Sequence, residues 1–278
     1  MSQKIIIDAG ATKTAFAVVH DGVVVCEHTG KGINPNYTSD KDILHVMVNF
    51  KFNESSYGTA DEVFYYGAGC AGWENANRME RLLQSFFPDA NIHVYSDLIA
   101  VCHALSRGRR SIVGILGTGA ATCLFDGTYV ENRAPSLGYM LGDEGSGTNL
   151  GKRLLTAYLR GQLSPELESM LLKIYNVSFS DVIHCLYRES EPNRFMASFA
   201  PFVRNHLDDP LVRKLAIDAF RDFFSIQKSY YEEAETLEWN LSGSVAYHFQ
   251  EIVREAADHE HCRVGEIIEA PLPLLVKQ

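Results

Sequence analysis

The sequence predicts an α/β protein built from two related domains, and two observations support this. A unit of strand, glycine loop, strand, Asp-Gly turn and strand occurs twice, about a hundred residues apart, which indicates an internal duplication. Apolar runs of strand length also alternate with segments of helical periodicity, the pattern of a sheet covered by helices. We therefore expect two domains that face each other across a cleft.

The first unit begins with a short apolar run at residues 4–8 that ends in a carboxylate, Asp8. Strands are predicted at 14–20 and 23–28, and the Asp-Gly pair between them is typical of a hairpin turn. The remaining predicted elements of this half are strands at 62–66 and 91–95 and a helix at 97–106.

The second unit has predicted strands at 111–116, 121–125 and 129–132. Helical periodicity then dominates, with one more strand, and the predicted elements are helices at 145–160, 165–175, 180–188, 193–206 and 211–235 and a strand at 237–241. We expect one domain at 1–110, completed by the C-terminal segment 265–278, and a second at 111–264 with helical additions.

Charge and composition exclude several classes of protein. The 278 residues are 46% hydrophobic and 22% charged, which is typical of a globular protein. The net charge of −10 and the lack of a basic patch argue against a nucleic-acid partner. No apolar run of membrane-spanning length and no signal peptide is evident, so we expect a cytoplasmic protein with no membrane partner. The six cysteines form no CxxC pair and are interpreted as reduced core residues.

Each unit carries a loop of small residues after its first strand, where backbone N–H groups can approach phosphate oxygens. We call these the first phosphate loop, Gly10, Ala11, Thr12 and Lys13, and the second phosphate loop, Gly117, Thr118 and Gly119. The hydroxyls of Thr12 and Thr14 could add donors, and Asp8 could hold magnesium, directly or through water. The alternative interpretation of each loop is an ordinary tight turn.

Other polar positions have both a functional and a structural interpretation. Asp97 lies between a strand and a helix, where it is a candidate general base or a plain N-cap. Asp143 and Glu144 precede a helix and could simply favour its N-terminus. Asn36, with Asn34 as its competitor, lies in a proline-containing turn. The segment GAGCAG at 67–72 formally fits a dinucleotide fingerprint, which leaves NAD binding as a minor alternative.

Five motifs in order resemble the actin-like ATPase and sugar-kinase superfamily. They are DAGATKTAFAVV, SDLIAV, ILGTGAATCLFDG, SLGYMLGDEGSGTNLGK and LSGSVA, and together they cover nearly the whole chain. The resemblance is closest to the branch of N-acetylglucosamine kinases and BadF-type ATPases, the activators of 2-hydroxyacyl-CoA dehydratases. It implies duplicated ribonuclease-H-like domains around a nucleotide and sugar cleft, with ATP and Mg²⁺ as cofactors.

The resemblance also implies roles for individual residues. Asp97 would accept the proton of the attacking sugar hydroxyl, as a base of ordinary strength can in a loose phosphoryl-transfer transition state. Sugar contacts would come from Asn36, Gly69, Asp97, Asp143 and Glu144, and adenosine contacts from Gly243, Ser244 and Val245. Two departures stand out: Ala120 and Ala121 replace the Ser-Asn of many relatives, and Ser244 replaces a common glycine.

The function that this resemblance implies is transfer of the γ-phosphate of ATP to a hydroxyl, most plausibly O6, of an amino sugar such as N-acetylglucosamine. Two alternatives stay open: an ATPase activator that shares an iron–sulfur cluster across a dimer, and a sugar sensor without turnover. The identity of the sugar and the question of a homodimer stay open as well.

Overall fold

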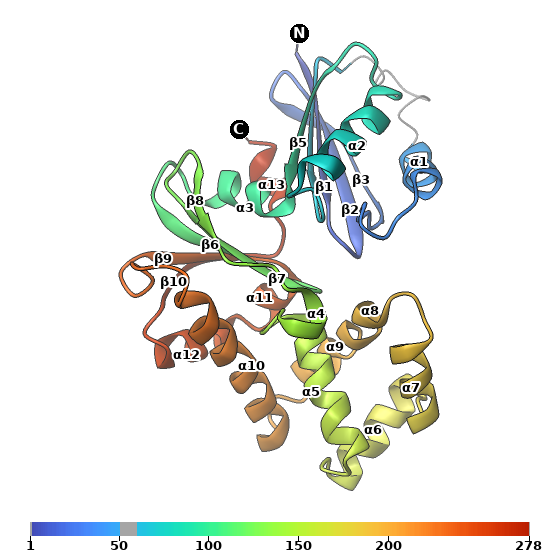
Figure 1. The fold of residues 1–278 in the computed structure, drawn as a ribbon, viewed down its shortest axis with the longest axis vertical. Coiled ribbons are helices and arrows are strands. Elements are labelled where there is room, and N and C mark those ends of the chain that lie inside the picture. Colours follow the sequence, from blue (N-terminus) through green and yellow to red (C-terminus); the bar gives the residue numbers. More distant parts are fainter. Residues whose placement is uncertain (1, 51–59, 278) are drawn as a thin grey trace. The chain divides into compact units, whose positions relative to one another are not determined.

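Two five-stranded mixed sheets organise the computed structural model, which describes residues 2–50 and 60–277 (Figure 1). The chain divides into unit 1, which runs to Arg107 and resumes at Ala270, and unit 2, which spans Gly108–Glu269. Residues 1, 51–59 and 278, which the predicted domain spans include, lie outside the described residues.

Unit 1 has the strand order β3-β2-β1-β4-β5. The strands are β1 (Gln3–Ala9), β2 (Lys13–His20), β3 (Val23–Lys31), β4 (Glu62–Gly67) and β5 (Asn91–Ser96). Strands β1, β2 and β3 form an antiparallel meander, whereas β1, β4 and β5 are parallel. Ile5, Ile6 and Ile7 of β1 are all buried, as expected for a central strand that is covered on both faces.

Among the described residues of unit 1, helices α1 and α2 lie on one face of this sheet and α3 and α13 on the other (Figure 1). They are α1 (Asp40–Asn49), α2 (Trp73–Gln84), α3 (Asp97–Leu105) and α13 (Leu272–Leu275). Ser39 caps α1 by accepting a hydrogen bond from the Asp42 amide. The helices α1 and α2 were not predicted from the sequence, whereas α3 begins at the predicted residue.

Unit 2 repeats this architecture. Its strands are β6 (Ser111–Leu116), β7 (Ala120–Phe125), β8 (Val130–Arg133), β9 (Glu238–Ser242) and β10 (Arg263–Ile268). Their order, β8-β7-β6-β9-β10, has the same pattern of antiparallel and parallel neighbours as β3-β2-β1-β4-β5. The duplicated α/β fold that the sequence predicted is therefore confirmed. GAGCAG connects β4 to α2, and α2 leads to the parallel strand β5. In the same sheet β2 runs antiparallel to its neighbours β1 and β3, whereas the sheet of a dinucleotide-binding domain is parallel, so the sheet does not favour the NAD interpretation of GAGCAG.

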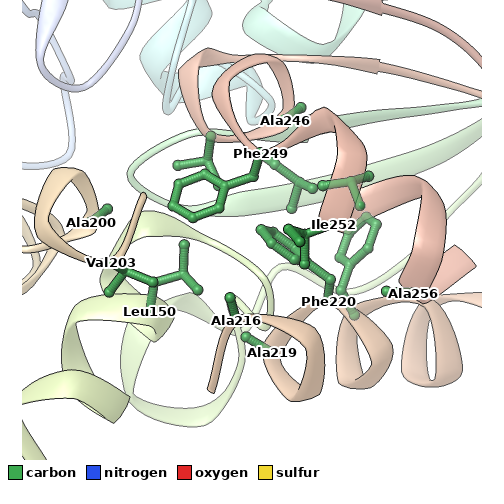
Figure 2. Packing of buried hydrophobic residues seen from close by; sticks show 14 of the residues in the cluster. Leu150, Ala200, Val203, Ala216, Ala219, Phe220, Ala246, Phe249, Ile252 and Ala256 are labelled. Atoms are coloured by element: carbon green, nitrogen blue, oxygen red, sulfur yellow. The ribbon is translucent and has the colours of Figure 1, made fainter. Parts of the chain in front are cut away.

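Helices form the rest of unit 2. They are α4 (Gly138–Leu141), α5 (Gly147–Leu159), α6 (Pro165–Tyr175), α7 (Phe179–Tyr187), α8 (Pro192–Ala197), α9 (Ala200–Asn205), α10 (Pro210–Lys228), α11 (Ser244–His248) and α12 (Gln250–His259). The core that joins them to the sheet includes Phe220 of α10, whose ring lies 5.6 Å from that of Phe249 (Figure 2). Ala216 and Ala219 on α10, and Ala256 on α12, are small and fully buried, which lets the two helices pack closely.

Four predicted boundaries differ from the structure as follows. The single helix expected at 193–206 is two helices, because Pro201 lies in the first turn of α9 and proline does not fit a helix interior. The helix expected to reach 235 ends at Lys228. The assignment of 265–278 to the first domain is wrong for residues 265–269, because β10 pairs with β9 of unit 2; after that strand, α13 contacts α3 and β1 of unit 1. The division between the units falls at Arg107 rather than at residue 110.

Candidate active site

The parallel strands β1, β4 and β5 of unit 1 end at paired residues, and two acidic residues lie next to these strand ends. Ala9 of β1 pairs with Gly67 of β4, and Gly67 pairs with Ser96 of β5. Asp8 comes one residue before these paired residues and Asp97 one residue after them. The carboxyl ends of parallel strands are where α/β proteins commonly assemble their sites, because the chain turns there into loops and helix N-termini.

Asp97 is the first residue of α3, and the N-cap position belongs to Ser96. One carboxylate oxygen of Asp97 accepts a hydrogen bond from the Leu98 amide at 2.9 Å. The positive end of the helix dipole favours a carboxylate there. Apart from this half-buried residue, α3 is anchored by a buried face that includes Leu98, Val101 and Cys102, so the backbone that carries Asp97 is firmly held. Asp97 therefore follows the N-cap residue rather than occupying the N-cap position.

Asp8 is electrostatically coupled to Asp97. The pKa of Asp8 is raised to about 7: burial is the largest cause, the negative charge of Asp97 also raises it, and Lys13 lowers it. Two carboxylates and one ammonium group thus share the end of the sheet in unit 1. A cation near Asp8 would relieve the cost of its buried charge.

The first phosphate loop is a tight turn whose amides are only partly available. The Gly10 amide donates to the Lys13 carbonyl at 2.9 Å, so it offers no N–H to a phosphate in this conformation. Gly32 packs against the loop so closely that a Cβ there would lie 2.5 Å from Ala11 backbone atoms, a requirement that the sequence did not reveal. Thr14 is fully buried, and among the described residues its hydroxyl has no hydrogen-bond partner.

The second phosphate loop is held by the N-terminus of α5. The Gly147 amide donates to the Gly117 carbonyl at 2.8 Å, and both the amide and the hydroxyl of Thr148 donate to the Thr118 carbonyl at 3.2 and 2.6 Å. The loop carbonyls therefore face α5. The Gly117 amide donates to the Gly119 carbonyl at 3.0 Å, so Gly117, like Gly10, shapes its loop rather than donating from it.

Asp143 lies against this second loop. One of its carboxylate oxygens accepts a hydrogen bond from the Ala120 amide at 3.1 Å, and its carboxylate is the nearest group to a Cβ at Gly119. Burial raises the pKa of Asp143, the Ala120 hydrogen bond lowers it, and the neighbouring Glu144 raises it. This partner of Asp143 is a backbone amide, so it does not depend on the alanine side chain at position 120. Asp143 and Glu144 belong to unit 2, whereas Asn36, Gly69 and Asp97 belong to unit 1.

The predicted adenosine motif also adjoins the second phosphate loop. Gly243 has a φ of +114° and lies so close to β6 that a Cβ there would be 2.3 Å from the Leu116 carbonyl oxygen. Only glycine fits both requirements. A Val245 methyl lies 3.5 Å from where a Cβ of Gly147 would be. Ser244 begins the short helix α11 directly after Gly243. Unit 2 therefore brings together the motif, the loop and the start of α5.

The loop around Asn36 is held by two polar residues that sequence reasoning missed, Asn75 and Arg78, both on α2. Asn75 Nδ2 donates to Asn36 Oδ1 at 2.7 Å and to the Gly69 carbonyl at 2.9 Å. Arg78 donates to the carbonyls of Pro35 and Thr38 at 2.6 and 2.9 Å. Asn75 and Arg78 are three residues apart, so they lie on the same side of the helix, and this spacing was the only sign of their joint role in the sequence.

Gly69 and Cys70 complete this corner of unit 1. Gly69 has a φ of +82°, and a Cβ there would lie 2.4 Å from Asn34 Oδ1. The pKa of the Cys70 thiol is raised to about 12: burial is the largest cause, the negative charge of Asp97 also raises it, and Arg78 lowers it. Cys70 is therefore a neutral thiol beside Asp97. In the part of the chain that the structure describes, no three His, Cys, Asp or Glu side chains form a metal-binding group, and no helix is long and apolar enough to cross a membrane.

Comparisons with known proteins identify relatives of the whole chain. No model of a known protein family matches the sequence. The N-acetyl-D-glucosamine kinase of Dictyostelium discoideum is 24% identical in an alignment of 255 residues that covers 82% of this chain and 80% of that protein. The structure of a Porphyromonas gingivalis protein assigned as an N-acetylglucosamine kinase matches with a TM-score of 0.92 and 31% identity, over 100% of this chain and 98% of that one.

A more distant structure shares the fold. The ROK family glucokinase of Streptomyces griseus, solved in complex with glucose and AMPPNP, matches with a TM-score of 0.62 and 16% identity over 99% of this chain and 98% of that one. At this identity the likeness concerns the fold alone. The five motifs and the 31% identity over the full length support a closer relationship to the Porphyromonas gingivalis protein.

Proposed function

The chain belongs to the N-acetylglucosamine kinase and BadF-type ATPase family of the actin-like ATPase superfamily. From this premise we propose which hydroxyl group it phosphorylates and which residues take part in the reaction. It is an ATP-dependent amino sugar kinase. We propose that it transfers the γ-phosphate of ATP to O6 of N-acetylglucosamine. The observation that supports Asp97 as the catalytic residue is the position of its carboxylate at the start of α3, where it interacts with the carboxylate of Asp8.

In the proposed reaction Asp97 accepts the proton of the sugar hydroxyl while the hydroxyl oxygen bonds to the γ-phosphorus. The bond from that phosphorus to the bridging oxygen breaks, and ADP leaves. A loose transition state needs little proton transfer early on, so the main task of Asp97 is to orient the hydroxyl. Its anchored helix suits that task.

Asp8 is the proposed site for Mg²⁺, held directly or through water. The fit rests on its donor chemistry and charge: carboxylate oxygens are the ligands that Mg²⁺ prefers, and the raised pKa of Asp8 reports negative charge that its surroundings compensate poorly. Magnesium typically takes one or two carboxylates together with substrate phosphates. When bound, it would offset the charge of the phosphate oxygens.

The remaining assignments are proposals of the same kind. Ala11, Thr12, Lys13, Thr118 and Gly119 are proposed to contact the phosphates, with Gly10 and Gly117 as the residues that shape the turns. Gly243, Ser244 and Val245 are proposed to contact adenosine. Asn36, Gly69, Asp143 and Glu144 are proposed to contact the sugar. We propose the cytoplasm as the location, since ATP is supplied there.

Gly117 offers a test of the second phosphate loop that does not disturb the fold. Among the described residues nothing lies within 4 Å of a Cβ built at Gly117, and its φ is not left-handed, so Gly117→Ala should fold normally. A methyl group in the space of a bound phosphate should raise the KM for ATP at least about tenfold, because close packing penalises even one added carbon. Steady-state kinetics at saturating sugar measure this.

Gly72→Ala is the matched control, since a Cβ at Gly72 also meets nothing within 4 Å and Gly72 has a φ of −93°. Its KM for ATP should equal that of the wild type. An unchanged KM in Gly117→Ala would mean that the phosphates bind elsewhere.

The proposed function itself is tested by ADP formation with a panel of sugars. N-acetylglucosamine, N-acetylmannosamine, glucosamine and glucose are each added to enzyme, ATP and Mg²⁺, and the phosphorylated position of the product is read by NMR. We expect sugar-dependent ADP formation with N-acetylglucosamine and a phosphate on O6. No sugar-dependent turnover with any member of the panel would sink the proposal and favour a sensor or an ATPase activator.

A further inference from the structure

Asn75 connects the two segments of unit 1 that are proposed to contact the sugar. It lies on α2 and is partly buried. Its Nδ2 group donates to Asn36 Oδ1 on one side and to the Gly69 carbonyl on the other, at 2.7 and 2.9 Å. One side chain from a neighbouring helix thereby ties Asn36 and Gly69 together.

This arrangement determines which end of the Asn36 amide is engaged. The Gly69 carbonyl can only accept a hydrogen bond, so the Asn75 atom that faces it must be the Nδ2 donor. The Asn36 atom that receives the other hydrogen of this group must then be the oxygen. Within residues 2–50 and 60–277, Asn36 Nδ2 makes no hydrogen bond to the protein. Asn36 is exposed, and the group it offers to a ligand is the N–H donor.

Asn34 does not compete for this role. Its side-chain oxygen accepts from the Asn36 amide at 3.0 Å, which is an Asx turn, and its carbonyl accepts from the amides of Tyr37 and Thr38 at 3.0 and 2.9 Å. Asn34 therefore shapes the turn, and Asn36 is left at its tip. The sequence alone could not separate the two asparagines.

The backbone of this turn is held independently of Asn75. Arg78 donates to the carbonyls of Pro35 and Thr38 and forms an ion pair with Asp40. Removing the Asn75 amide should therefore release the Asn36 side chain without releasing the turn. This separation makes the role of Asn75 measurable.

We propose that Asn75 is a positioning residue that holds the Asn36 carboxamide as a hydrogen-bond donor toward an oxygen of the sugar. The inference rests on the proposed sugar-kinase function and adds to it the polarity of one contact. The oxygen belongs either to the acetamido carbonyl or to a ring hydroxyl. Asn75 itself need not touch the sugar, since it acts through Asn36.

The test inverts this polarity with the substitution Asn75→Asp. A carboxylate can donate neither to Asn36 nor to the Gly69 carbonyl. The Asn36 amide is then expected to turn, to donate to Asp at 75 and to present its oxygen to the ligand. We expect the KM for N-acetylglucosamine to rise about tenfold or more, the effect of one lost oriented hydrogen bond, with kcat within about threefold and the KM for ATP unchanged. Asn75→Ala, which releases the amide, should raise the same KM.

Asn77→Asp is the matched control, because it makes the same chemical change on an exposed position of the same helix. Its kinetics should equal those of the wild type. Binding of N-acetylglucosamine and of glucose, measured by calorimetry, locates the oxygen: the loss is confined to N-acetylglucosamine for the acetamido carbonyl and shared with glucose for a ring hydroxyl.

Two results would overturn the proposal. In the first, Asn75→Asp and Asn75→Ala have the sugar KM of Asn77→Asp. In the second, kcat and the KM for ATP worsen together with a lower melting temperature, as a purely structural role would give. The proposed function fails separately, since wild-type enzyme without sugar-dependent turnover would sink it before any variant is made.

Discussion

Asp97→Asn is expected to lower kcat for sugar phosphorylation by about 10²–10⁴-fold, the usual contribution of a positioned general base. Asparagine keeps the shape of the side chain but cannot accept the hydroxyl proton. The fold should be unaffected, because α3 is anchored by Leu98, Val101 and Cys102 rather than by the carboxylate. Coupled-assay kinetics measure kcat, and calorimetry measures the Kd for ATP, which should stay within about threefold of the wild type.

Asp89→Asn is the control for this substitution. Asp89 is an exposed aspartate of unit 1 in the turn before β5, and its replacement should leave kcat unchanged. If Asp97→Asn retained kcat within tenfold of the wild type, the base would have to be another group. Asp8 would then be the next candidate, because it is the carboxylate coupled to Asp97.

Asp8→Asn is expected to stabilise the metal-free protein at alkaline pH while removing activity. The pKa of Asp8 is raised from 3.8 to about 7 in the folded state, so folding favours its protonated form. The wild type therefore loses stability as pH rises from about 4 through about 7, and the full cost applies above that. A shift of this size corresponds to about 4 kcal/mol as an upper value. Asparagine has no charge to bury and should avoid the cost.

Scanning calorimetry in EDTA at pH 4.5, 6 and 8 checks this prediction. The melting temperature of Asp8→Asn should exceed that of the wild type by an amount that grows with pH, and the difference should be smallest at pH 4.5. Asp89→Asn should show no such gain, since that side chain is exposed. A variant less stable than the wild type at pH 8 would contradict the raised pKa of Asp8. Variants that gain stability and lose activity are common when a charged residue of a functional site is replaced.

The duplicated sheet could be predicted because its signal is local. Each copy repeats an apolar strand, a small-residue loop and an Asp-Gly turn, and these patterns depend on residues that are neighbours in the chain. β10 was not predicted as a strand, because its burial is only partial and Arg263 and Glu266 interrupt the apolar pattern. The break between α8 and α9 was visible in principle as Pro201, but the apolar spacing continued across it.

The residues that hold the site were less predictable than the residues proposed to act. Asp97 and both phosphate loops follow strands directly, which made them candidates from the sequence. Asn75 and Arg78 lie on the polar side of a helix and look like solvent-facing residues there, since their partners Asn36 and Pro35 lie 39 and 43 residues away in the chain. Only the packing of α2 beside the turn reveals their role.

The sequence by itself determined the duplication, the order of the five motifs and the candidate carboxylates, because each depends on short-range pattern and residue type. The tertiary structure decided how polar groups are used: which amides of the phosphate loops are already bonded, that Asp143 lies on the second loop, and that Asn36 rather than Asn34 offers a donor. The physical reason is that a hydrogen bond or a raised pKa depends on partners brought close by folding, and sequence spacing does not specify them.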